Sequence, residues 1–278
     1  MSKKYSFYAQ ASCGYVIKGI FEILLECLTT DVPLCIKESG ISSCCMDKEK
    51  NKLIDLNLPM SNFDKKYKCM KERKISVHLK TFCKLIKNVK KKDSLALFLE
   101  NDDSNDLGIQ IMPTSTNNED NSDGKETSMM KIHDVICPNI IIPVGYYYPK
   151  SIKSVSYQKM CKKMAAFGQK VVHVTMQKNF YLQFKGTTDI ISACVECGNI
   201  EEDEETALYE ANFSIDSLAQ FIKMSTLSPN IQVYSPKNSA QLPLKIESHT
   251  SLGIFRAFIK TEEQIIAEKD ARCSKERK

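Results

Sequence analysis

The chain has 278 residues, 42% of them apolar, so it can bury a full core in one large domain or in two of about 130 residues. Its formal net charge of +5 excludes a uniformly basic, histone-like protein, and any nucleic-acid site must come from a local arrangement of charges. No stretch approaches the roughly 18 apolar residues of a membrane span, and 12 scattered cysteines without an evident signal peptide favour free thiols in a reducing compartment over a disulfide framework.

The first half of the chain is predicted to alternate helices with short strands. A helix is predicted at 14–27, because its apolar residues recur with a helical period, and a second one runs from residue 77 to about residue 90. Strand-like runs lie at 34–37, 52–58, 67–70 and 94–100. A further strand is predicted at 107–112, followed by a polar, acidic, solvated loop at 114–127.

The second predicted helix carries a row of lysines on one face. Its members recur at i, i+4, i+7 and i+11, and they are Lys80, Lys84, Lys87 and Lys91. The opposite face is apolar and consists of Leu79, Phe82, Leu85, Ile86 and Val89. Like charges at i, i+4 cost an isolated helix roughly 0.2–0.5 kcal/mol per pair. The row therefore indicates an anionic partner, of which nucleic-acid phosphate is the commonest, with an ordinary solvated face as the alternative.

The second half repeats the pattern of the first after an extended connector. The connector, at 132–148, contains two prolines and an apolar run but no helical period, which places it on a surface. Helices are then predicted at 154–167 and at about 217–226. Strands are predicted at 171–176, 180–184, 189–197, 207–215, 231–234, 242–247 and 253–259, with an acidic turn at 201–205. Residues 260–278 are expected to form a frayed charged tail.

The two halves align with a shift of 139 residues, from position 79 to position 218. Leu79-x-x-Phe82-x-Lys84 then lies over Leu218-x-x-Phe221-x-Lys223. In the first helix of each half, Val16, Phe21 and Leu25 lie over Val155, Met160 and Met164. The third predicted helix also has a basic face, Lys159, Lys162 and Lys163, opposite Tyr157, Met160, Cys161 and Met164. Two copies of one helix-plus-strand module are therefore predicted.

Several segments, in order, carry a family resemblance. They are ESGISSCCMDKEKNKLIDLNL (38–58), FDKKYKC (63–69), VHLKTFCKLIKNVKKKDSLAL (77–97), YQKMCKKMAAFGQKVV (157–172), SLAQFIKMSTLSPNIQVY (217–234) and LPLKIESHTSLGIFRAFI (242–259). Together they resemble the eukaryotic-type sliding clamps, the proliferating cell nuclear antigen family, over nearly the whole chain.

The resemblance implies an α+β DNA clamp fold of two similar domains, each with two helices packed on antiparallel sheets. It implies clamp domains at 1–135 and 151–262, joined by a connector at 136–150 and followed by a charged tail at 263–278. Subunits would close into a ring, usually a homotrimer, by pairing edge strands expected at 128–135 and 190–197.

The implied function is that of a non-enzymatic processivity factor. It would encircle double-stranded DNA without reading sequence and tether DNA polymerase and other proteins that carry clamp-binding peptides, after a clamp loader has placed it. Expected locations are the nucleus or, for a viral chain, a cytoplasmic replication site; the lysine and asparagine bias and the slight basicity suit a large DNA virus or an AT-rich protist. A specialised clamp subunit, checkpoint-like, heteromeric or serving viral transcription, is the alternative.

The resemblance also implies DNA-contacting residues. Lys84, Lys87, Lys162 and Lys223 match hole-lining basic positions of the family, and helical facing adds Lys80, Lys159 and Lys163. The first helix departs from the family pattern, because its polar face carries Lys18 but also Glu22 and Glu26, and because Leu25 stands at a basic position of the family.

A partner-peptide pocket is implied beneath the connector. Matching positions are Met46, Leu53, Ile140, Ile141, Ile142, Pro143, Tyr146, Pro243 and Phe258. Two departures predict an altered peptide preference. Lys50-Asn51 replaces the His-Val of the family, and Phe258-Ile259-Lys260-Thr261 replaces its Tyr-Leu-Ala-Pro.

Other chemistry finds weaker support in the residues. Cys194-x-x-Cys197 is half a zinc site, but positions i and i+3 of a strand point to opposite faces. The acidic run at 100–106 suits a solvated turn better than a metal-dependent nuclease. No phosphate-binding Gly-rich loop is present. We therefore predict no catalytic residue, metal or cofactor, and we keep an unrelated nucleic-acid or metal enzyme as a third hypothesis.

Overall fold

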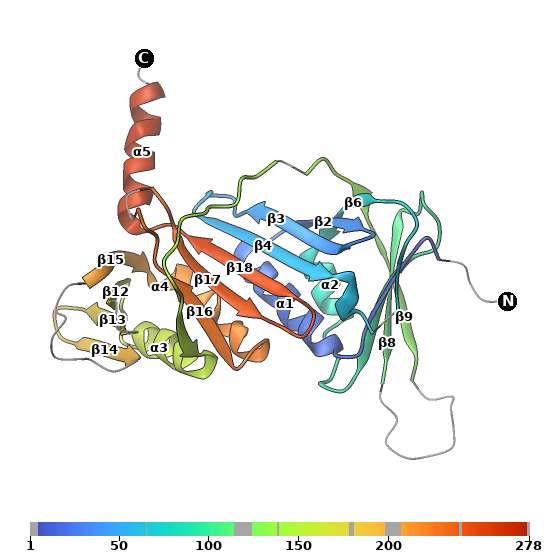
Figure 1. Cartoon of the computed structure of the whole chain (residues 1–278), viewed down its shortest axis with the longest axis horizontal. Helices are drawn as coiled ribbons and strands as arrows, with labels where there is room; N and C mark the ends of the chain where they lie inside the picture. The colour runs from blue at the N-terminus through green and yellow to red at the C-terminus, as the bar shows by residue number, and fades with distance from the viewer. Residues whose placement is uncertain are drawn as a thin grey trace. The chain divides into compact units, whose positions relative to one another are not determined.

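The computed structural model describes residues 5–64, 66–113, 124–137, 139–177, 181–197, 207–238 and 241–276, which form two compact units (Figure 1). Unit 1 contains Met1–Cys45, Ile54–Ile140 and His249–Phe255. Unit 2 contains Met46–Leu53, Ile141–Ser248 and Arg256–Lys278. Each unit therefore combines segments from both halves of the sequence. Among the described helices, none has both the length and the apolar character needed to cross a membrane.

Unit 1 contains a five-stranded antiparallel sheet in the order β5-β1-β7-β8-β9. Its strands are β1 (Phe7–Ala11), β5 (Tyr67–Cys69), β7 (Ser94–Leu99), β8 (Asp106–Met112) and β9 (Glu126–Lys131). A second run of neighbouring strands has the order β10-β6-β2-β3-β4. These are β2 (Asp31–Lys37), β3 (Gly40–Met46), β4 (Lys52–Pro59), β6 (Arg73–His78) and β10 (His133–Asp134), and the 3₁₀ turn η1 (Met60–Asn62) follows β4.

Two helices fill unit 1 between these strands. Helix α1 (Gly14–Leu28) contacts β7 and β2, and α2 (Leu79–Leu85) contacts β9 and β6, so each helix contacts strands of both runs. The rings of Phe21 on α1 and Phe82 on α2 stack with centroids 4.0 Å apart. Late in the chain, Gly253 has a φ of +152°, and a side chain there would collide with the backbone of Asn57 on β4. The segment at 249–255 therefore packs closely on the first half of the sequence.

Unit 2 repeats the plan of unit 1. One run of strands has the order β18-β17-β16-β11, and a four-stranded antiparallel sheet has the order β14-β13-β12-β15. The strands are β11 (Lys150–Lys153), β12 (Val171–Gln177), β13 (Leu182–Thr187), β14 (Ser192–Cys197), β15 (Ala207–Ser214), β16 (Asn230–Tyr234), β17 (Leu244–His249) and β18 (Ile254–Ile259). Helix α3 (Ser154–Ala166) contacts β11, α4 (Ile215–Ala219) and the 3₁₀ helix η2 (Ile222–Thr226), and α4 contacts β15.

The predicted repeat is clearest in the second helix of each unit. Leu79 and Phe82 in unit 1 and Leu218 and Phe221 in unit 2 are all fully buried. The first helices correspond less well, because Val16 is 6% exposed whereas its counterpart Val155 is 51% exposed. The internal similarity therefore reflects the packing of the second helices more than that of the first.

Both second helices are shorter than predicted. The helix expected from residue 77 to about residue 90 is only α2, because Val77 and His78 belong to β6 and the chain turns after Leu85. His78 accepts a hydrogen bond from the Thr81 amide at the start of α2, and Asp93 accepts one from the Lys90 amide, 2.8 Å away. The side chain of Asp93 therefore takes up an amide that a longer helix would have used internally.

The helix expected at 217–226 divides into α4 and η2. Apolar residues recur there every third position, at Leu218, Phe221, Met224 and Leu227, and all four are buried. A 3₁₀ helix has three residues per turn, so it places such residues on one face. The amides of Phe221 and Met224 accordingly bond to carbonyls three residues back, those of Leu218 and Phe221.

The expected frayed tail at 260–278 is instead mostly helical, as α5 (Glu262–Glu276). Thr261 and Gln264 form a capping box: the Gln264 amide donates to the Thr261 hydroxyl and the Thr261 amide to the Gln264 side chain, each at 3.1 Å. Gln264 also donates to the Leu242 carbonyl at 2.9 Å, and Asn212 of β15 donates to Glu263 at 2.7 Å. The Thr-x-x-Gln spacing was a signal that the charge of this segment concealed.

We expect the variant Thr261→Ala to loosen α5 without unfolding unit 2. Loss of an N-cap hydroxyl costs about 1 kcal/mol, so amides in the first turn of α5, such as that of Ile265, should exchange with solvent about five times faster. Hydrogen–deuterium exchange measures this rate. The control Thr261→Ser keeps the hydroxyl and should exchange as the parent chain does, and equal rates in all three proteins would contradict the capping role.

Candidate nucleic-acid and partner interfaces

The lysine row of unit 1 is fully on the surface. Lys80, Lys84, Lys87 and Lys91 are all exposed, whereas Leu79, Phe82, Ile86 and Val89 opposite them are buried and Leu85 is half-buried. The predicted division into a charged and a packed face is thus confirmed, although only Lys80 and Lys84 stand on α2 and the other two lie in the turns after it. Helix α2 contains no acidic residue, so nothing within it offsets the positive charge.

Lys18 has hydrogen-bond partners that the sequence did not indicate. Its ammonium group donates to the carbonyls of Lys87, at 2.5 Å, and of Val89, at 3.3 Å. These carbonyls lie just after α2, where backbone acceptors have no partner within the helix. Lys18 therefore fixes the turn that carries Lys87, a positioning role that a lysine on the polar face of the first helix did not reveal.

Unit 2 has a corresponding basic surface. Lys159, Lys162 and Lys163 on α3 are exposed, and their helix contains no acidic residue. The opposite face is buried, as predicted, and consists of Tyr157, Met160, Cys161 and Met164. The Tyr157 hydroxyl donates to the Leu218 carbonyl of α4 at 2.8 Å, which ties the two helices together. Lys223 on η2 is only half-buried rather than fully exposed, because the 3₁₀ turn brings it closer to the packed face.

Two six-residue strands stand at sheet edges in the described residues, β9 in the five-stranded sheet and β14 in the four-stranded sheet. The opposite edges of these sheets are β5, which has only three residues, and β15, which α5 contacts; α2 contacts β9. An edge strand offers unpaired backbone groups to another chain, and a very short edge offers few. The edge strand expected at 128–135 is interrupted at the buried Ile132. Its first part belongs to β9, which ends at Lys131, whereas His133 and Asp134 form β10 and pair with β6.

Three residues of the expected peptide pocket meet in unit 2. The Tyr146 hydroxyl donates to the Pro243 carbonyl at 3.0 Å, and the Tyr146 ring centroid lies 6.1 Å from that of the buried Phe258. Burial raises the pKa of Tyr146, so its hydroxyl remains a donor at neutral pH. Tyr146, Pro143 and Pro243 are half-buried, so this group forms a partly exposed apolar floor.

The hairpin that carries Met46 and Leu53 also belongs to unit 2. Asp47 accepts a hydrogen bond from the Lys52 amide at 2.8 Å, and the Asn51 carbonyl accepts one from the Lys260 amide at 3.0 Å. The two departures from the family pattern, Lys50-Asn51 and Lys260-Thr261, are therefore in direct backbone contact. Leu53 is buried, whereas Met46 is exposed.

The connector presents apolar side chains to solvent next to this floor. Ile141 is 87% exposed and Ile142 39% exposed, while Ile140 is half-buried at the end of unit 1. A further cavity of about 450 Å³ is lined by Tyr146, Tyr147, Tyr148, Pro149, Tyr234 and Lys237. Of these residues, only Tyr146 was a predicted site residue. The Lys237 ammonium lies 5.9 Å from the Tyr147 ring centroid. Three consecutive tyrosines were the signal for this aromatic surface.

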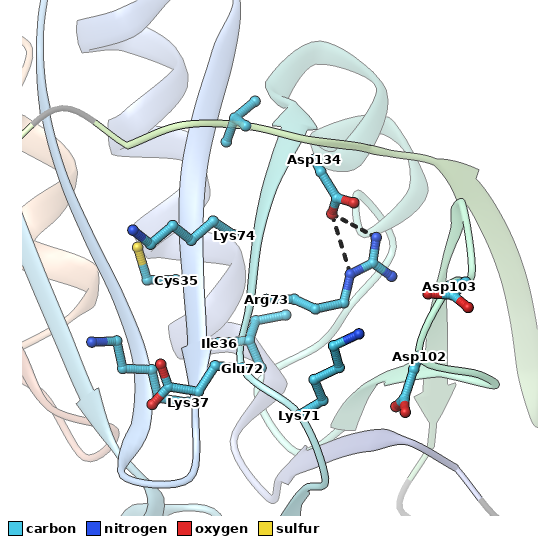
Figure 2. A pocket seen from close by; sticks show the side chains of 11 residues that line it. Cys35, Ile36, Lys37, Lys71, Glu72, Arg73, Lys74, Asp102, Asp103 and Asp134 are labelled. Atoms are coloured by element: carbon cyan, nitrogen blue, oxygen red, sulfur yellow. Dashed lines mark hydrogen bonds and ion pairs between the residues drawn. The ribbon is translucent and has the colours of Figure 1, made fainter.

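The acidic run at 100–106 borders a mixed-charge cavity of about 380 Å³ in unit 1 (Figure 2). Asp102 and Asp103 line it and are exposed, as a solvated turn requires. Its centre is Arg73, whose 7%-exposed side chain donates to Asp134 at 2.6 and 3.2 Å and to the Ser104 carbonyl at 2.8 Å. These bonds fasten β10 and the turn after β7 to β6, so the cluster has a structural role.

The Cys194-x-x-Cys197 pair lies on β14. Cys194 is exposed and Cys197 is half-buried, and in the part of the chain that the structure describes no three His, Cys, Asp or Glu side chains are grouped as metal ligands. The loop expected at 114–127 lies outside the described residues as far as residue 123, and its last two residues, Glu126 and Thr127, belong instead to β9. The acidic turn expected at 201–205 lies entirely outside the described residues.

Comparison with known proteins covers both halves. Residues 7–135 match the family model "Proliferating cell nuclear antigen, N-terminal domain", and residues 145–261 match the corresponding C-terminal domain. The "Probable DNA polymerase sliding clamp" of Autographa californica nuclear polyhedrosis virus is 26% identical over 91% of this chain and 95% of its own length. The "Probable DNA polymerase sliding clamp 1" of Paramecium bursaria Chlorella virus 1 is 27% identical over 86% and 90%, respectively.

The fold has a counterpart among solved structures. The crystal structure of proliferating cellular nuclear antigen from Entamoeba histolytica has a TM-score of 0.78 against this chain, covers 93% of it and is 17% identical in sequence. This likeness concerns the fold. The helix α5, which begins at Glu262, lies beyond the end of the matched C-terminal domain.

Proposed function

Because this chain belongs to the proliferating cell nuclear antigen family, we propose that it is a DNA polymerase sliding clamp whose lysine-bearing helices contact the DNA it encircles. The observation that carries the proposal is the repeated basic helix face. Each unit exposes a row of lysines on a helix whose other side is buried, and neither helix contains an acidic residue. The proposed role is binding and tethering, without catalysis.

The lysines suit contact with phosphate and not with bases. Lysine is a flexible point charge, and its contacts with the DNA backbone carry no sequence information. Such contacts exchange readily with counterions, so a ring that holds DNA through them can move along the duplex. We assign this role to Lys80, Lys84, Lys87, Lys159, Lys162, Lys163 and Lys223.

Ring closure is proposed to use two edge strands, β9 of one subunit and β14 of the next. A head-to-tail contact between two different surfaces closes into a ring when the rotation between subunits permits it. The edges have equal length, which supports their pairing. We propose a homotrimer, placed on DNA by a clamp loader.

The pocket set of unit 2 is the proposed docking site for polymerase and other partner peptides: Met46, Leu53, Ile141, Ile142, Pro143, Tyr146, Pro243 and Phe258. The contact between Asn51 and Lys260 supports an altered peptide preference at this end of the pocket. It is also the observation that favours the second candidate, a specialised clamp subunit with its own partners. Either function would place the protein where DNA is replicated, in the nucleus or at a viral replication site.

The DNA-binding proposal is tested by the double variant Lys84→Glu with Lys87→Glu. Fewer counterions are released when these contacts are lost. The negative slope of log affinity against log salt should therefore become less steep, by about 1 for each phosphate contact removed. Stimulation of polymerase on primed templates should fall as well. Both side chains are exposed, so folding should be unaffected.

A matched control separates a local from a global charge effect. Lys68→Glu with Lys71→Glu makes the same change in net charge at exposed positions of the same unit, on β5 and in the bend after it. This control should keep the parental salt slope. An unchanged slope and unchanged stimulation in the helix variant, or an equal loss in the control, would show that the lysine row is an ordinary solvated face.

A further inference from the structure

Two cysteine side chains meet where the connector leaves unit 1. The Sγ atoms of Cys35, on β2, and Cys137, on the connector, are 3.4 Å apart, and both side chains are half-buried. Cys35 alternates along β2 with the buried Leu34 and Ile36, so it lies on the opposite face from the core. Its partner in the β2–β6 ladder is Lys74, and Figure 2 shows both side chains on the same side of the strands.

The backbone brings Cys137 to this position. His133 and Asp134 pair with β6, and the Val135 amide donates to the Lys74 carbonyl at 3.0 Å. Cys137 therefore follows directly on a segment that is fixed by main-chain hydrogen bonds. A disulfide has an S–S distance of about 2.05 Å, so the two sulfur atoms must approach by a little more than an ångström. Cys137 can move toward Cys35, because the neighbouring Ile136 is exposed and so does not hold the connector by packing.

We propose that Cys35 and Cys137 form a reversible disulfide under hydroperoxide stress, which pins the start of the connector to β2. The sulfur of Cys35 attacks the peroxide, the O–O bond breaks, and a sulfenic acid forms while an alcohol, or water from hydrogen peroxide, leaves. The sulfur of Cys137 then attacks the sulfenic sulfur, and the hydroxyl group leaves with the Cys137 proton as water. Two thiols are thereby oxidised by two electrons and one peroxide is reduced. This chemistry does not depend on the clamp function.

The surroundings slow the first step and favour the second. Burial raises the pKa of the Cys137 thiol to about 11, although the Lys74 ammonium acts in the opposite direction. Because the thiolate is the nucleophile, this burial slows attack of the Cys137 sulfur on peroxide. Cys137 can still resolve a sulfenic acid held beside it, since the reacting atoms are already in contact. The pair should therefore stay reduced in a thiol-rich compartment and oxidise under a sustained peroxide load.

The test uses the full chain treated with hydrogen peroxide and analysed by non-reducing peptide mapping. We expect a linked peptide pair containing Cys35 and Cys137 as the main disulfide, reversed by dithiothreitol. In each of Cys35→Ser and Cys137→Ser this link must be absent, while Cys194→Ser, at an exposed thiol on β14, should retain it. Circular dichroism of each variant verifies that the serine has not disturbed the fold.

Neighbouring thiols provide the competing outcome. Cys44 and Cys45 on β3 lie close enough to interact electrostatically with Cys35 and Cys137, respectively. Main products that join Cys35 to Cys44, Cys137 to Cys45, or two separate chains would overturn the proposal, as would overoxidation of Cys35 without any link. Hydrogen exchange at Ile136 and Cys137 gives a second readout. It should slow at least severalfold in the oxidised protein and recover on reduction, and unchanged exchange would overturn the pinning of the connector.

Discussion

Proline in place of Cys194 is expected to convert the proposed ring into monomers. Thr188 and Ile191 face each other at the turn between β13 and β14, and the Thr188 amide donates to the Ile191 carbonyl, so they form a hydrogen-bonded pair. In an antiparallel ladder such as β13–β14, hydrogen-bonded pairs alternate with pairs that are not bonded to each other. Cys194, which faces Lys185, falls on a non-bonded pair, and its own amide therefore points to the open edge. Cys194→Pro removes an outward donor without breaking a bond to β13, and proline is tolerated at such edge positions.

The measured quantity is particle mass by light scattering at micromolar concentration. The parent chain should have three subunit masses of 31.5 kDa each, and Cys194→Pro one. Processive synthesis by the polymerase should disappear with the ring. Cys194→Ala keeps the amide and should remain assembled, which separates the backbone from the side chain. A monomeric parent, a trimeric proline variant or a dissociated alanine variant would each count against pairing at β14.

The second large effect is expected at the connector. Ile142→Glu should abolish binding of the polymerase peptide while the ring stays assembled. Ile142 is 39% exposed, so part of its side chain is available to a partner and part packs locally. Apolar anchors at the centre of an interface commonly contribute about 2 kcal/mol or more, and a loss of this size weakens binding by about 30-fold or more. A buried glutamate adds a desolvation cost.

Titration of a labelled polymerase peptide onto intact rings decides the question. Ile136→Glu is the matched control, because it places the same charge on the same connector at a 97%-exposed side chain in unit 1. The control should bind as the parent does. If Ile142 serves only to pack the connector, its variant will melt at a lower temperature, yet intact rings will bind peptide with the parental affinity.

The features that the sequence predicted best depend on local periodicity. The lysine faces of α2 and α3 follow from a spacing of three or four residues, and burial of the opposite apolar residues confirms it. The edge strands β9 and β14 also lie near the expected ones at 128–135 and 190–197, although β9 ends at Lys131. Such patterns survive folding because one face of each element must be buried whatever its exact length.

Other features depend on partners distant in sequence. The end of α2 is set by Asp93 and by Lys18, whose ammonium comes from another helix to the carbonyls of Lys87 and Val89. The helix α5 is held by Gln264 on the Leu242 carbonyl, a contact that composition cannot indicate. The strands β1, β6 and β11 were not predicted, because their apolar content becomes meaningful only when neighbouring strands bury it.

The distribution of segments between the two units constrains how the chain is made. A ribosome adds about 5–20 residues per second, and domains commonly fold in order as they emerge. Here unit 1 lacks the stretch His249–Phe255 until nearly the whole chain exists, and the hairpin at Met46–Leu53 waits for the later parts of unit 2. The interval between residues 46 and 255 corresponds to roughly 10–40 s of translation. Unit 1 is complete only at the end of that interval and unit 2 only after it, so a chain truncated before residue 249 contains no finished unit.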